Sequence, residues 1–129
     1  MKKFFSILLV AILSGALLTA CNGGNHAVNE DMNGQIISVK AGETLTVKLD
    51  GNPTTGYSWQ LADMNDAILK QAGDPDYKAD SLLVGSGGTY TYHFTAMSAG
   101  TVVLKFNYLR IWEKDVTPYR TFTITVEVK

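Results

Sequence analysis

The fold is decided by residues 89–109, which run TYTYHFTAMSAGTVVLKFNYL. Successive side chains of a β-strand point to opposite faces, so an apolar residue at every second position predicts a strand with one face in a core. Both halves of the stretch show this period, and the chain turns between them at 98–100. The residues expected in the core are Tyr90, Tyr92, Phe94 and Ala96 in the first half, and Val102, Leu104, Phe106 and Tyr108 in the second.

The same two-residue period continues on both sides of this stretch. Residues 119–128 alternate apolar side chains with Thr and Glu, and predict the last strand. Residues 35–39, 44–49 and 57–61 predict three earlier strands, rich in Val, Ile, Thr and Leu. Residues 63–71 fit either one helical turn or an irregular edge strand, so their structure stays open.

These segments predict an all-β domain over residues 35–129. About seven short antiparallel strands in roughly 95 residues, with turn residues every ten or so positions, are typical of an immunoglobulin-like sandwich. A closed β-barrel is the alternative. Trp59 is expected near the centre of the domain.

Composition limits what else the chain can be. It has 129 residues, of which 46% are hydrophobic and 18% charged, as expected for one compact domain. The net charge of −1 gives no basic surface to attract phosphates, so nucleic-acid binding is not expected.

The N-terminus predicts export and lipid attachment. Two lysines precede an apolar run over residues 4–20, as in a secretory signal peptide. The run ends in Leu18-Thr19-Ala20-Cys21, which resembles a bacterial lipobox, in which the cysteine is acylated and becomes the first mature residue. A membrane-spanning helix and an unmodified Cys21 thiol are the alternatives. We therefore expect a signal peptide over residues 1–20 and a lipid-anchored protein of the bacterial cell envelope, at the outer membrane or cell surface.

Residues 21–34 are expected to link the lipid to the domain. After Cys21 the segment NGGNHAVNEDMNG contains four Asn and three Gly with little to bury, which predicts a flexible tether.

The sequence offers little chemistry for catalysis. It has two histidines, one in the predicted tether and His93 on the polar face of a strand, and a single cysteine assigned to lipidation. These residues provide neither a nucleophile with a base nor a zinc site of normal spacing. Asp74 and Asp76 flank Pro75 in what is expected to be an ordinary turn. We therefore expect a binding module, not an enzyme, with no cofactor and no metal.

Three loops stand out because their residues suit binding better than simple connection. The loop at 50–57 combines Pro and Gly, which fix and free the backbone, around two threonines. The loop at 80–88 sets Leu82-Leu83-Val84 before three glycines, which suits contact with another surface; a flexible hairpin or a buried strand are alternatives. The loop at 110–118 carries Arg110 and Trp112, residue types enriched in interface hot spots, although Trp112 also suits a cap on the core.

In this order, the loop motifs NPTTGY, GSGG and RIW resemble those of chagasin-type inhibitors of papain-like cysteine peptidases. The resemblance covers nearly all of residues 35–129. It implies an immunoglobulin-like domain whose loops plug the cleft of the peptidase reversibly. We expect the protein to be a monomer. The implied peptidase-binding residues are Asn52, Pro53, Thr54, Thr55, Gly56, Tyr57, Gly85, Ser86, Gly87, Gly88, Arg110 and Trp112.

The resemblance also implies a role for each loop. Thr54 and Thr55 would approach the catalytic Cys–His pair of the peptidase, and 85–88 would run along its cleft. Arg110 and Trp112 would pack on the far side of the catalytic site. The sequence departs from the family at Ile111, where a proline is usual, so the third loop lacks one fixed backbone angle. An envelope adhesin or carbohydrate-binding lipoprotein, using Trp112 and the tyrosines, is the alternative function.

Overall fold

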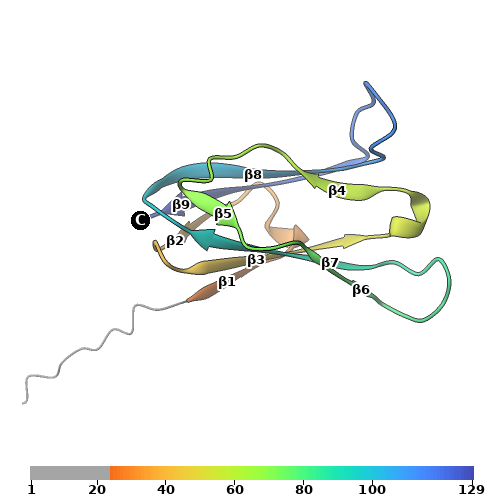
Figure 1. Ribbon diagram of the computed structural model, residues 1–129, viewed down its shortest axis with the longest axis horizontal. Coiled ribbons are helices and arrows are strands. Elements are labelled where there is room, and N and C mark those ends of the chain that lie inside the picture. The colour runs from red at the N-terminus through yellow and green to blue at the C-terminus, as the bar shows by residue number, and fades with distance from the viewer. Residues whose placement is uncertain (1–23) are drawn as a thin grey trace, which may run out of the picture.

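The computed structural model describes residues 24–129 as two β-sheets packed face to face, with two short 3-10 helices (Figure 1). This arrangement confirms the predicted sandwich. The first sheet contains β1 (Asn25–Val28), β3 (Thr44–Gly51), β7 (Gly88–Ala96), β5 (Leu69–Gln71) and β6 (Asp76–Ala79), in which both β5 and β6 pair with β7. The second sheet has the order β2 (Ile36–Val39), β9 (Arg120–Val128), β8 (Gly100–Leu109) and β4 (Ser58–Leu61). The helices are η1 (Glu30–Met32) and η2 (Pro53–Thr55).

The core lies between the two sheets and follows the predicted alternation. The largest fully buried side chains include Phe94 of the first sheet and Phe106 of the second, whose ring centroids are 6.2 Å apart. Trp59 is 5% exposed, as predicted, and its indole N–H donates to the carbonyl oxygen of Asp50 at 3.0 Å. Tyr90 is only partly buried against this core.

Strand count and direction differ from the prediction. The described residues form nine strands, and two pairs are parallel: β1 with β3, and β2 with β9. The sequence pattern missed β6 because all four of its residues are exposed, which leaves no alternation to detect. In the open region 63–71, a turn in which the Ile68 N–H donates to the Asn65 carbonyl oxygen leads into the short strand β5, so the edge-strand alternative was correct.

The prediction of a flexible tether is wrong for residues 25–34. Asn25 aligns with Thr44 at the start of β1, and Val28 is 2% exposed in the core. The Asn29 side chain caps η1 by accepting from the Asp31 N–H at 3.0 Å, and the Gly34 N–H donates to Thr123 at 2.7 Å. Val28 and the partly buried Met32, together with backbone pairing on the open edge of β3, order this polar segment. The domain therefore begins before residue 35.

The predicted signal peptide over 1–20 and the lipidation site Cys21 lie outside the described residues. Within residues 24–129, no helix has the length and apolar character needed to cross a membrane.

Candidate functional site

The three loops singled out in the sequence lie at one end of the sandwich. The first follows β3 and contains η2, the second joins β6 to β7, and the third joins β8 to β9. All three lie at the right-hand end in Figure 1, opposite the C-terminus.

The first loop is a capped turn. The Asn52 side chain accepts from the Thr54 N–H at 3.1 Å, Pro53 occupies the first helical position, and Gly56 ends the turn in the left-handed region with φ 82°. These are the positions at which Asn, Pro and Gly are favoured. Thr54 and Thr55 are exposed, but their hydroxyls bond within the loop, to the side-chain and the backbone oxygen of Asn52 respectively. The threonines thus brace the tip that carries them.

The first loop is tied to the second through Asn52. Its side-chain amide donates to the Gly85 carbonyl oxygen at 2.9 Å. Gly85 has φ 83°, and a Cβ on Gly88 would overlap the Lys78 carbonyl oxygen and the Tyr77 ring. Ser86 donates from its hydroxyl to the Ser81 carbonyl oxygen at 3.1 Å. The glycines of GSGG are therefore needed at the base of the second loop, where the chain turns and two backbones meet.

The first loop also supports the third. The Arg110 Nε donates to the Thr55 carbonyl oxygen at 3.1 Å, and the Arg110 guanidinium lies 4.4 Å from the centroid of the Tyr57 ring. The indole ring of Trp112 lies directly over Gly56, where a Cβ would collide with it. Arg110 also forms an ion pair with Glu113 at 3.4 Å. The Arg110 side chain is thus used within the protein, and Trp112 is the largest apolar side chain that the third loop exposes.

Trp112 is not a core residue. Its side chain is 65% exposed, which decides between the two positions that the sequence left open. The second loop is similar: Leu83 is 77% exposed and its neighbours Leu82 and Val84 are fully exposed, so this segment is not a buried strand. Large apolar side chains exposed together are uncommon on a monomer and mark binding surfaces. The exposed apolar residues of the second and third loops are Leu82, Leu83, Val84, Ile111, Trp112 and Val116.

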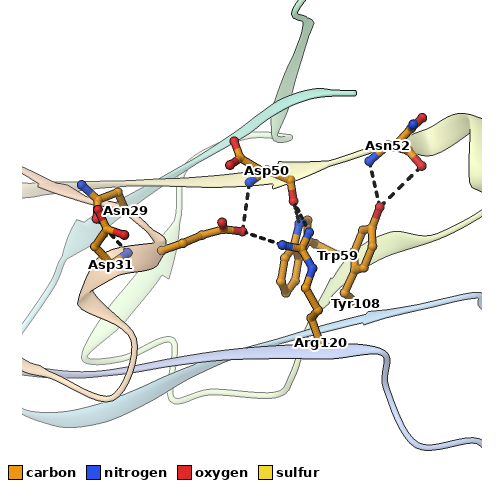
Figure 2. A network of polar contacts seen from close by, with 8 residues as sticks. Asn29, Asp31, Asp50, Asn52, Trp59, Tyr108 and Arg120 are labelled. Carbon is orange, nitrogen blue, oxygen red and sulfur yellow. Dashed lines mark hydrogen bonds and ion pairs between the residues drawn. The ribbon is translucent and has the colours of Figure 1, made fainter. Parts of the chain in front are cut away.

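A polar network forms the floor beneath the first loop, and Figure 2 shows it from close by. Arg120 lies against Trp59 and Tyr108, with its guanidinium carbon 5.0 Å and 4.7 Å from their ring centroids. It donates to the Asp50 carbonyl oxygen at 2.6 Å. The Tyr108 hydroxyl accepts from the Asn52 N–H at 2.8 Å. The last residues of β3 are thus fixed from the opposite sheet.

Glu30 completes this floor from the N-terminal segment. Its carboxylate accepts from the Asp50 N–H at 3.1 Å and pairs with Arg120 at 3.3 Å. Burial raises the pKa of the Glu30 carboxyl, and the charge of Arg120 opposes that rise without cancelling it. The hydrogen bond from the Asp50 N–H also favours the ionised carboxylate, so Glu30 joins Arg120 to the end of β3.

Sequence reasoning missed Glu30 and Arg120, and it included Asp50 in the first loop without assigning it a role. Glu30 lay in the presumed tether, and Arg120 opens a Thr-rich strand, where an arginine looks like an ordinary exposed residue. Their contact joins residues 90 positions apart, and no local pattern encodes it. An open pocket of about 640 Å³ lies beside this floor, lined by loop residues together with Tyr57, Tyr108, Tyr119 and Arg120.

The two histidines lie outside the three loops. His26 pairs with Glu43 at 3.2 Å and His93 with Asp76 at 3.4 Å, so each has a carboxylate beside it. Within residues 24–129, no three His, Cys, Asp or Glu side chains gather in a way that suits a metal ion. What the loop cluster provides is a shaped surface with an exposed indole.

Comparison with known proteins identifies the family. Residues 38–126 match the profile described as chagasin family peptidase inhibitor I42. Chagasin of Trypanosoma cruzi is 30% identical over 104 residues, which cover 78% of this chain and 94% of that protein.

Solved structures agree on the fold. A cysteine protease inhibitor of Entamoeba histolytica has a TM-score of 0.75 at 24% identity, covering 83% of this chain and 97% of its own. PbICP-C, solved in complex with falcipain-2, has a TM-score of 0.55 at 18% identity. The match covers 84% of this chain and 92% of PbICP-C. With the family profile spanning most of the sandwich and all three loops, the chain belongs to the chagasin family of peptidase inhibitors.

Proposed function

We propose that this chain, a peptidase inhibitor and not an enzyme, reversibly blocks papain-like cysteine peptidases by inserting its three loops into their active-site cleft. The observation that carries the proposal is the meeting of NPTTGY, GSGG and RIW at one end of the sandwich, joined by Asn52–Gly85 and Arg110–Thr55 hydrogen bonds. The Entamoeba protein is itself a cysteine protease inhibitor, and PbICP-C binds falcipain-2; both support this choice of partner.

Each loop has a distinct role in this proposal. Thr54 and Thr55 at the tip of η2 approach the catalytic Cys–His pair, and residues 85–88 lie along the cleft. Trp112 packs beside the catalytic site on the other side, and Arg110 holds the third loop against the first. Inhibition then needs no reactive group, because the loops exclude substrate by filling the cleft.

The contacts between loops favour tight binding. Loops that are already ordered lose less conformational entropy on docking, so more of the contact energy appears as affinity. Here the first loop is joined to both others and to the floor formed by Arg120, Tyr108 and Glu30. This bonding offsets the loss of the family proline at Ile111.

The test uses the mature chain carrying Cys21→Ser, which removes the acylation site. It should inhibit papain as a monomer, without being cleaved, and should spare trypsin and thermolysin. Papain activity should return after dilution at the rate of dissociation. The proposal fails if micromolar inhibitor slows no papain-like peptidase, and glycan binding by the same protein would then favour the carbohydrate-binding alternative.

We expect Asn52→Ala to weaken inhibition several-fold. The change removes a helix cap, which costs about 0.5–2 kcal/mol, and also the bond to Gly85. Asn52→Asp keeps the cap oxygen and loses only the amide donor, so it separates the two effects. Asn65→Ala removes a similar bond, to the Ala67 N–H, in a loop outside the site. Inhibition constants that rise equally for Asn52→Ala and Asn65→Ala would contradict a specific role for Asn52.

We also propose that Cys21 is acylated and anchors the protein in the bacterial envelope. The support is the lipobox-like Leu18-Thr19-Ala20-Cys21 after an apolar run. Several acyl chains, at about 0.8 kcal/mol per buried methylene, would hold the protein permanently.

The corresponding prediction is a loss of membrane attachment in Cys21→Ser. Wild-type protein should incorporate labelled fatty acid and sediment with membranes, whereas Cys21→Ser should do neither and still inhibit papain. Wild-type protein that is released unlabelled after cleavage elsewhere would rule out the anchor.

A further inference from the structure

We infer that β1 fixes the membrane anchor at the end of the sandwich opposite the three loops, so that the inhibitory surface faces away from the bilayer and acts on peptidases free in solution. The inference rests on the proposed acylation of Cys21 and on the proposed role of the loops. It adds an orientation and a class of target that neither proposal contains.

The position of chain entry follows from strand register. β1 is parallel to β3, with Asn25 opposite Thr44 and Val28 opposite Val47. β3 then continues to Gly51, and the first loop starts at Asn52. The chain therefore enters beside the first residue of β3, whereas the loops begin after its last residue. In Figure 1, β1 begins toward the left-hand end and the loops lie at the right.

The distance from the chain entry to the loops is greater than the length of the connection to the lipid. From Thr44 to Asn52 the strand advances eight residues, about 27 Å at roughly 3.4 Å per residue. Only three residues separate Cys21 from Asn25, and this connection reaches at most about 14 Å even if fully extended. The connection from Cys21 to Asn25 is thus shorter than the distance from Asn25 to the three loops. A flexible tether over 22–34 would be long enough to let the loops reach the bilayer.

Several contacts keep β1 paired with β3. If β1 separated from β3, the flexible connection to Cys21 would become longer. The Thr44 N–H donates to the Gly24 carbonyl oxygen at 3.0 Å. The Asn25 side chain accepts from the hydroxyls of Thr44 and Thr46 at 3.0 and 3.1 Å. His26 Nε2 lies 3.2 Å from a Glu43 carboxylate oxygen, and the hydrogen bond from the Lys40 N–H lowers the pKa of the Glu43 carboxyl. These bonds lie at the first residues of β1, where peeling would begin.

The orientation selects among targets. A papain-like peptidase dissolved in the surrounding medium meets the loops directly. The cleft of a peptidase held close to the same bilayer lies nearer to the membrane than the loops do. The short connection from Cys21 to Asn25 prevents the domain from turning over to reach that cleft. The protein is thus suited to peptidases dissolved in the compartment that its membrane face adjoins.

The first test measures orientation on vesicles. Full-length acylated protein is reconstituted in phosphatidylethanolamine and phosphatidylglycerol, with a donor dye on Ala99→Cys or on Lys114→Cys and an acceptor on the headgroups. Both positions are exposed; residue 99 lies in the turn opposite the loops and residue 114 in the third loop. Energy transfer should be several-fold greater from residue 99. Twenty Gly and Ser residues inserted between Gly23 and Gly24 should reduce the difference. Equal transfer from both positions in the native spacing would overturn the inference.

The second test measures reach. Vesicle-bound inhibitor should inhibit papain in solution as well as the Cys21→Ser chain does, but should inhibit papain held on the same vesicles by a short linker at least tenfold less. The inserted Gly–Ser segment should restore inhibition of the held enzyme. Loss of inhibition by Cys21→Ser would count against the proposed function, and unbound wild-type protein against acylation. Equal inhibition of free and held papain, with both of those intact, would overturn the orientation itself.

Discussion

Trp112→Ala should weaken inhibition of papain about thirtyfold or more, roughly 2 kcal/mol, and leave the melting temperature nearly unchanged. The indole is 65% exposed and lies over Gly56 outside the core, so its removal opens no cavity in the core. A large aromatic side chain held on a rigid surface has much apolar area to bury on docking and loses little entropy.

The other tryptophan supplies a matched control. Trp59 is 5% exposed and lies between the sheets, so Trp59→Ala should lower the free energy of unfolding by about 3–5 kcal/mol. Inhibition by its folded fraction should fall much less than for Trp112→Ala, because Trp59 only supports the floor beneath the first loop. Inhibition constants and melting temperatures for both variants show whether Trp112 contributes to binding or to stability. A Trp112→Ala protein that melts early but inhibits normally when folded would show that the third loop is structural.

Gly56→Ala should weaken inhibition about tenfold and also lower stability by about 1–2 kcal/mol. The stability loss comes from the backbone, because φ is 82° and an alanine there adopts an unfavourable left-handed conformation. The loss of inhibition comes from the side chain, since the new Cβ must displace the Trp112 ring from its position over the first loop.

Gly73→Ala separates these two effects. Gly73 has φ 74°, and a Cβ there meets no atom within 4 Å, so this variant carries the backbone strain alone. It should lower the melting temperature and leave inhibition unchanged. In a Trp112→Ala background, Gly56→Ala should have much less effect on inhibition. Additive losses in that double mutant would contradict the proposed support of Trp112 by Gly56.

The sandwich could be predicted because its core is encoded locally. Alternation along residues 102–108 and 122–128 requires one buried face in each strand, and those residues are buried as expected. The strands that were missed, β1 and β6, contain one buried residue between them. They are held by backbone hydrogen bonds to the open edges of the sheet. Such bonds do not depend on side-chain type, so they leave no two-residue period in the sequence.

The candidate site was predictable in part for a similar reason. Proline and glycine at fixed positions marked the first loop, and its motif suggested the partner class. The exposure of Trp112 was not predictable, because an indole near a strand end suits a core or a surface equally well. The support from Glu30 and Arg120 depends on which strands become neighbours, and that is a property of the whole fold.

The pairing of β2 with β9 has a consequence for when this protein can fold. Ile36 lies beside Thr125 and Val39 beside Val128, so a strand near the start of the domain has no partner until the last residues of the chain are present. Contacts this distant along the chain slow folding, because a large loop must close before they form. During synthesis the second sheet therefore stays incomplete until residues 120–128 are made. For the exported protein proposed above, this delay helps to keep the chain unfolded and able to cross the membrane before the sandwich closes.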